Sequence, residues 1–153
     1  MNFLSQLDLI FNKFHSVAKQ LERRYNDRDT IKINDEFDVQ NLLHSLCVIF
    51  FNDIRNEETN PSFADILTRS DFLLSNEKII IETKFASRNN FKKLSGEMIQ
   101  DIPNYKRHPD CTSIFFFIYD PNYLFENRGG LKKDIESLSD ENVNVKVYIR
   151  PEQ

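Results

Sequence analysis

Asp71, Glu82 and Lys84 stand close together in residues 69–84, which read RSDFLLSNEKIIIETK. Side chains alternate along a β-strand, so Glu82 and Lys84 would share one face of the second strand. If the turn centres on residues 76–77, Asp71 lies opposite Glu82, with Cβ atoms about 5 Å apart. This register is an assumption, because a slip of one residue would break the pairing.

The chemistry of these three side chains suits phosphodiester hydrolysis. Two opposed carboxylates repel each other, but a hard divalent cation such as Mg²⁺ prefers oxygen ligands and would hold them together. A bound metal would polarise a phosphate and acidify a water molecule. Lys84 would orient that water or stabilise the charge that develops on the phosphate.

An isolated Glu-x-Lys on a strand is usually a solvated ion pair, and three features favour a site instead. Glu82 follows three isoleucines, so it lies at the end of a core strand. Asp71 is expected on the neighbouring strand. A helix with the polar residues Glu97, Gln100 and Asp101 follows directly.

Length and composition bound the class of protein. The chain has 153 residues, a net charge of −4 and two cysteines. This is enough for one domain with its own core, and too few cysteines for a disulfide framework. No apolar run approaches the length of a membrane helix, so we expect a cytoplasmic protein without a membrane partner. Because the chain is acidic, any nucleic acid would have to bind through a local basic patch.

The first part of the chain predicts two helices. Apolar residues recur at steps of three and four from Phe3 to Leu21, which indicates an amphipathic helix. This helix either packs on its own domain, which we favour, or forms a coiled-coil dimer. Asn34 or Asp35 would cap a second helix, whose buried face would contain Val39, Leu42, Leu43, Leu46, Phe50 and Ile54. We divide the chain into a helical extension, residues 1–30, and a main domain, residues 31–153.

The rest of the chain alternates between strands and helices. Strands are expected over 70–74, 79–85, 112–119 and 143–150, with a further one around 63–67; the third would be covered on both faces, and the last would be near an edge with one wet face. A loop is expected over 57–62. A third helix is expected over 91–102, which Pro103 should distort or end. A short fourth helix is expected after a turn at Gly129–Gly130. The fold class is therefore α/β, with a mixed β-sheet flanked by helices, a hairpin first and crossover connections later.

These elements and their residues resemble a known group of nucleases. An aspartate, ten residues and then Glu-Thr-Lys is the pattern of the PD-(D/E)XK nuclease superfamily. The segments NDEFDVQNLLH, FNDIRNEE, RSDFLL and YKRHPDC resemble more narrowly the small restriction-endonuclease-like domains of the DpnII and MboI type. The resemblance covers roughly residues 24–151.

The resemblance implies a restriction-endonuclease-like fold and Mg²⁺ or Mn²⁺ as cofactor. It assigns catalysis to Asp71, Glu82 and Lys84. The metal ligands would be Asp71, Glu82 and the backbone carbonyl of Thr83. One departure is Ser70, which stands where the superfamily carries its variable proline.

Other residues receive looser roles. Glu36 and Gln40, one helical turn apart, are accessory candidates from the second helix. Arg69, Arg88 and Lys92 are candidates for contacts to the DNA backbone, although solvated basic residues are an equal alternative. The same two alternatives apply to a second basic cluster, formed by Arg23, Arg24 and Arg28.

The expected function is metal-dependent hydrolysis of DNA, with a role in restriction or defence against foreign DNA implied by the resemblance. A homodimer would supply two sites for two strands, or a partner protein would supply specificity. The alternative is a catalytically silent nuclease fold that acts as a binding or scaffold module.

Overall fold

The computed structural model describes residues 1–56 and 71–152 of the chain. In chain order, its elements are α1 (Phe3–Glu22), η1 (Tyr25–Asp27), α2 (Glu36–Cys47), β1 (Ile54–Arg55), β2 (Asp71–Leu74), β3 (Ile79–Phe85), η2 (Phe91–Lys93), α3 (Leu94–Lys106), β4 (Ser113–Tyr119), α4 (Arg128–Glu136) and β5 (Asn144–Arg150). The loop expected over 57–62 and the strand expected around 63–67 lie outside the described residues.

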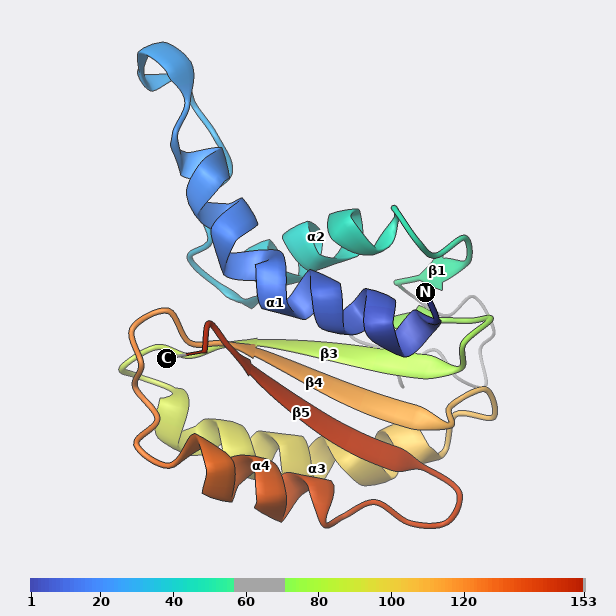
Figure 1. Cartoon of the computed structure of the whole chain (residues 1–153). Helices are drawn as coiled ribbons and strands as arrows, with labels where there is room; N and C mark the ends of the chain where they lie inside the picture. The colour runs from blue at the N-terminus through green and yellow to red at the C-terminus, as the bar shows by residue number, and fades with distance from the viewer. Residues whose placement is uncertain (57–70, 153) are drawn as a thin grey trace.

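One mixed sheet organises the molecule, with strand order β1-β2-β3-β4-β5. β2 and β3 pair antiparallel, and β3, β4 and β5 pair parallel. The crossover helices α3 and α4 cover one face, and α1 and α2 cover the other (Figure 1). This α/β arrangement confirms the predicted class, with the hairpin before the crossovers.

The two faces of the sheet bury different cores. Ile79 and Ile81 belong to the core beneath α1 and α2, whereas Ile80 belongs to the core beneath α3 and α4. Since side chains alternate along β3, Glu82 and Lys84 lie on the α3 side together with Ile80. Glu82 and Lys84 therefore face α3, the helix that follows β3 in the chain.

Helix α1 packs on the chain's own sheet, as favoured over a coiled coil. Its apolar face is buried, and the Phe11 ring centroid lies 5.1 Å from Phe117 of β4 and 4.5 Å from Tyr148 of β5. The boundary proposed at residue 30 stays a prediction.

Helix α2 is shorter than its apolar pattern predicts. The Asp35 side chain accepts a hydrogen bond from the Asp38 backbone N–H and caps the helix, which ends at Cys47. Phe50 therefore lies beyond the helix. Ile54 lies in β1, a two-residue strand that the sequence did not predict and that pairs with β2.

Two further boundaries differ from expectation. Pro103 does not end α3, which continues to Lys106; the buried Ile102 and Tyr105 on either side hold this last turn against the core. Gly129 and Gly130 lie in the first turn of α4 rather than in a preceding turn. The Asn127 side chain accepts from the Gly130 N–H, and a Cβ at Gly130 would collide with that side chain.

The last two strands largely follow their patterns. β4 is buried on both faces, as expected. β5 is an edge strand of the described sheet, but only part of its second face is wet, because Tyr148 is buried against α1. Within residues 1–56 and 71–152, no helix is long and apolar enough to cross a membrane.

Candidate active site

The β2–β3 hairpin brings the two acidic residues together in the expected register. Asp71 pairs with Glu82, as Leu74 pairs with Ile79 at the turn. Both carboxylates are buried, with 0% of Asp71 and 2% of Glu82 exposed. A slip of one residue would have moved one carboxylate to the opposite face. Residues 75–78 form the turn that fixes this register.

Backbone direction places the Thr83 carbonyl on the Asp71 side of β3. The Ala86 N–H donates to Tyr119 O, and Lys78 O accepts from Thr112 N, so both peptide groups point toward β4. Peptide groups alternate along a strand, so those of Thr83 point the other way, toward β2. The Asp71–Glu82 pair is then of the non-hydrogen-bonded type, in which Cα atoms approach to about 4.5 Å.

Lys84 lies within a cage of four carboxylates. Its Nζ atom is 3.0 Å from Glu82 Oε1 and 3.3 Å from Glu97 Oε2. Asp101 Oδ2 and Glu36 Oε1 lie at 3.9 and 4.0 Å. Burial alone would lower the pKa of Lys84, but the charges of Glu82 and Glu36 outweigh it and raise the pKa above its usual value. Lys84 is therefore protonated and acts as a donor.

Glu82 divides its two oxygens between different tasks. Oε1 contacts Lys84, whereas Oε2 is buried and has no hydrogen-bond partner among the described residues. Burial, and then the charge of Asp71, raises the pKa of Glu82 well above its usual value, and the Lys84 charge does not outweigh them. A buried carboxylate oxygen without a partner is costly unless a proton or a cation reaches it.

Tyr105 of α3 completes the surroundings of Asp71. Its hydroxyl donates to Asp71 Oδ2 at 2.6 Å, and burial raises the pKa of Tyr105, which keeps this donor protonated. The sequence prediction did not include Tyr105. Its signal was the four-residue spacing of Glu97, Asp101 and Tyr105, which places all three on one face of a helix.

We expect Tyr105→Phe to weaken metal binding about 10- to 100-fold, because second-shell groups orient metal ligands. It should also cost about 1.5–3 kcal/mol of folding free energy, as loss of a hydrogen bond to a charged group does. Calorimetric titration with Mn²⁺ and thermal melting measure the two effects. Tyr119→Phe is the matched control, because it removes a hydroxyl bonded to His15 elsewhere. Equal metal affinity in both variants would contradict a positioning role for Tyr105.

The structure brings one of the two accessory candidates to the cluster. Glu36, at the start of α2, lies 4.0 Å from Lys84, and its backbone carbonyl accepts from the Thr83 hydroxyl at 3.4 Å. Burial raises the pKa of Glu36. Gln40 is buried one turn later and donates to Asn56 Oδ1 at 3.3 Å. The accessory roles of both stay predictions.

Of the three residues predicted to contact DNA, two lie in the described part of the chain. Arg69 lies outside the described residues. Arg88 is exposed after β3, and Lys92 is exposed in η2, where its Nζ lies 5.9 Å from the Phe91 ring centroid. A hollow of about 300 Å³ at the end of β3 is lined in part by Glu36. Because Glu36 also contacts Lys84, the cluster reaches the surface on this side.

The side chains fit a divalent cation in their chemistry. Asp71, Glu82 and the Thr83 carbonyl supply oxygen atoms, the ligands that Mg²⁺ prefers, and water completes such sites. The buried, unpartnered Oε2 of Glu82 is the observation that favours a cation. Among the described residues, no three His, Cys, Asp or Glu side chains form a metal-binding group. The expected set has two carboxylates, so it depends on the backbone carbonyl and on water.

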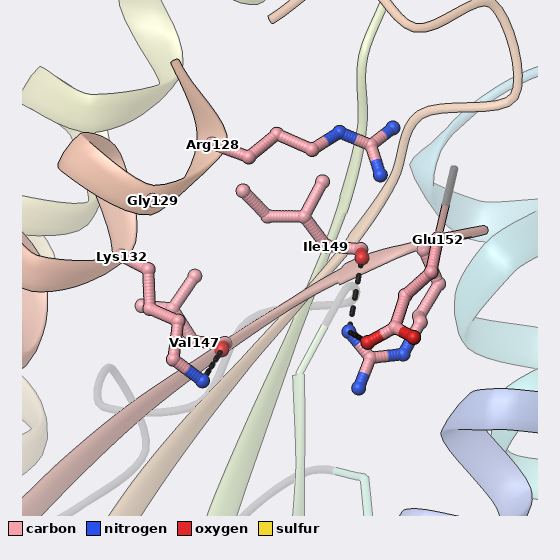
Figure 2. A pocket seen from close by; sticks show the side chains of 7 residues that line it. Arg128, Gly129, Lys132, Val147, Ile149 and Glu152 are labelled. Carbon is pink, nitrogen blue, oxygen red and sulfur yellow. Dashed lines mark hydrogen bonds and ion pairs between the residues drawn. The ribbon is translucent and has the colours of Figure 1, made fainter.

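A second hollow, of about 250 Å³, lies between α4 and β5 and is lined by the cations Arg128, Lys132 and Arg150. Figure 2 shows Lys132 directed at the Val147 carbonyl. Arg150 Nη1 lies 3.4 Å from Glu152 Oε1. Arg128 is paired with Asp120, at 3.0 Å, so each cation has a partner within the chain. We assign these contacts to holding the C-terminal segment in place.

Comparison with known proteins identifies a family. Residues 5–152 match the family model of DpnII-MboI restriction endonucleases. No curated protein and no solved structure matches the chain. The match spans α1, the Asp71–Glu82 hairpin and the carboxylate-bearing face of α3, and it confirms the resemblance read from the sequence. The chain belongs to the DpnII-MboI family of restriction endonucleases.

Proposed function

We propose that this protein is a metal-dependent endonuclease that hydrolyses DNA phosphodiester bonds. Family membership supports endonuclease activity on DNA. The observation that carries metal dependence is the buried pair Asp71–Glu82, in which Glu82 Oε2 has no hydrogen-bond partner in the described part of the chain. Asp71, Glu82 and the Thr83 carbonyl would hold Mg²⁺ or Mn²⁺, and the metal would polarise the phosphate and supply an acidified water.

The chain's own residues have distinct tasks in this proposal. Lys84 is protonated, so it donates a hydrogen bond to the attacking water or to the phosphate oxygens rather than accepting a proton. Tyr105 fixes one oxygen of Asp71. Glu97, 45% exposed at its side chain, and Asp101, 39% exposed, restrain Lys84 from the solvent side.

The biological setting follows from the same proposal. Restriction of foreign DNA is the role that the family supports. Cutting both strands needs two active sites, which a homodimer or a partner protein would bring together. Both cysteines, Cys47 and Cys111, are free and buried, which fits a reducing compartment such as the cytoplasm.

The expected result is cleavage of DNA with Mg²⁺ or Mn²⁺ and none with EDTA. Supercoiled plasmid, linear duplex and single-stranded DNA are incubated with the purified chain, and products are separated on gels. In parallel, saturation with either metal at about 100 times Kd should stabilise the fold by about 2.7 kcal/mol. This gain corresponds to a rise in Tm of about 5–10 °C.

The two readouts separate the alternatives. A metal-induced rise in Tm without cleavage would show a bound metal and a missing partner or substrate. Neither cleavage nor a rise in Tm would reject the proposal in favour of a catalytically silent scaffold.

A further inference from the structure

Between α1 and α2 the chain makes an excursion that carries no core residues. Leu21 and Ile33 are partly buried and pack against the core beneath α1 and α2. All residues from 22 to 32 are exposed except Thr30, which is half-buried. We call residues 22–32 the arm. Figure 1 shows it projecting from the body of the molecule, at the end of the sheet where β3 finishes and α2 begins.

The arm is a structured loop rather than a loose connection. The Thr30 hydroxyl donates to Leu21 O at 2.6 Å and closes its base. Arg24 Nη1 donates to Asp29 O at 3.2 Å across the loop. Asn26, with φ 59°, and Asp27, with φ 52°, turn the chain at the tip through the left-handed region. These contacts preserve the shape of the arm without any support from the core.

The exposed side chains of the arm include arginines and a tyrosine, which are residue types that contact nucleic acid in proteins. Tyr25 is 81% exposed, and the Arg28 guanidinium lies 5.8 Å from its ring centroid. The Arg23 backbone N–H donates to Gln20 O at 3.1 Å, but its side chain makes no hydrogen bond or ion pair with the described residues. Arginine bonds phosphates and base edges through a rigid fork, and the tyrosine hydroxyl is among the side-chain groups that hydrogen-bond the DNA backbone. The arm has four basic residues against three acidic ones, although the whole chain carries −4.

The arm is also close in sequence to the catalytic cluster. The residue that follows the arm is Ile33, which is partly buried against the core. Glu36 stands three positions after Ile33. Glu36 contacts Lys84 through its side chain and Thr83 through its backbone. A DNA duplex that presents a phosphate to Lys84 from this end of the sheet would therefore lie beside the arm.

We propose that the arm, residues 22–32, is a DNA-contacting element in which Arg23, Arg28 and Tyr25 grip the duplex next to the cleaved bond. The proposal rests on the proposed function for its ligand, DNA. It adds a binding surface outside the catalytic cluster, carried by a segment that contributes nothing to the core. This surface would supply the local basic patch that an acidic nuclease needs.

The test compares two pairs of substitutions with the same change in charge. One full-length variant carries Arg23→Ala and Arg28→Ala in the arm. The control carries Lys13→Ala and Lys133→Ala, which remove two exposed cations from α1 and α4. Tyr25→Ala is a third variant. Arg24 is kept because it closes the loop. Binding of a fluorescein-labelled duplex is followed by anisotropy in EDTA, over a range of salt concentrations.

We expect the arm pair to bind DNA at least tenfold more weakly and the control pair to change binding less than threefold. The slope of log affinity against log salt should fall by about 1.8 in the arm pair, because each lost phosphate contact accounts for about 0.9. Tyr25→Ala should weaken binding about two- to tenfold with little change in slope, since it removes an uncharged hydrogen bond to the DNA backbone.

Several outcomes would overturn the inference, and they are distinct from failure of the nuclease proposal. If the arm pair and the control pair lose DNA affinity equally, the effect comes from net charge and the arm makes no specific contact with DNA. Unchanged DNA binding with a changed oligomeric state by light scattering would assign the arm to a second copy of the chain. Arm-dependent binding by a protein that neither cleaves DNA nor gains Tm with metal would support the arm and reject the nuclease proposal, and absence of any binding by the wild type would reject the arm.

Discussion

Replacing Lys84 by alanine should reduce the rate of DNA cleavage by about 10²- to 10³-fold, the usual cost of removing a donor that stabilises developing charge. Lys84 is the cation shared by four carboxylates, and its Nζ lies 3.0 Å from Glu82. Single-turnover cleavage of a labelled duplex at saturating Mg²⁺ measures this effect separately from substrate binding.

The same substitution should change how the fold responds to metal. Without Lys84, the carboxylates of Glu36, Glu82, Glu97 and Asp101 have lost their common counter-ion. The metal-free variant should therefore melt below the wild type, and Mn²⁺ should raise its Tm by more than it raises that of the wild type. A purely structural lysine would give the first effect without the second.

A lysine in an exposed ion pair supplies the control. Lys106 pairs with Asp140 at 2.8 Å on the surface, and exposed pairs contribute at most about 1 kcal/mol. Lys106→Ala should leave cleavage and the metal response unchanged. If Lys84→Ala cleaves DNA as fast as Lys106→Ala does, Lys84 has no part in the reaction.

Replacing Glu82 by glutamine should abolish cleavage and, in the absence of metal, stabilise the protein at neutral pH. Glu82 is a buried carboxylate opposite Asp71 and has one oxygen without a partner. Glutamine has nearly the same shape, carries no charge and brings N–H donors for neighbouring carboxylates. A gain on the order of 1 kcal/mol would raise Tm by about 2–4 °C.

The effect of pH follows from the direction of the pKa shift. The pKa of Glu82 is raised in the folded protein above its ordinary value of 4.5, first by burial and then by Asp71. The folded state therefore binds the proton more tightly than the unfolded state does. The stability that this proton contributes is present below pH 4.5 and is lost as the pH rises above it. Glu82→Gln should lack this loss.

Bound metal should make the wild type more stable than Glu82→Gln, which reverses the order of stability expected without metal. Saturating Mg²⁺ or Mn²⁺ stabilises the wild type by binding its carboxylates, whereas Glu82→Gln has lost one ligand and should gain little. Thermal melts at several pH values, with EDTA or with metal, would show the two curves crossing. A glutamine variant that is less stable than the wild type in EDTA would show that the Glu82–Lys84 ion pair outweighs burial.

The hairpin that holds the acidic pair could be predicted because its signals are local. Four polar residues separate two apolar runs, which predicts two strands joined by a turn. The assumption that the turn centres on residues 76–77 placed Asp71 opposite Glu82, as the structure shows. The cap at Asp35 and the long helix α1 were equally local.

The features that the sequence did not reveal depend on contacts between distant segments. β1 is two residues long and forms only because β2 offers it an edge. α3 passes through Pro103 because burial of Ile102 and Tyr105 outweighs one missing hydrogen bond. The bond from Tyr105 to Asp71 joins residues 34 positions apart, which no periodicity reports.

The packing of α1 has a consequence for biosynthesis. Its aromatic residues Phe11 and Phe14 are covered by Phe117 of β4 and Tyr148 of β5. A ribosome adds about 5–20 residues per second, so the apolar face of α1 is synthesised seconds before the strands that bury it. During that interval it is a hydrophobic surface that chaperones can recognise. The core beneath α1 is therefore completed only after β5 has been synthesised.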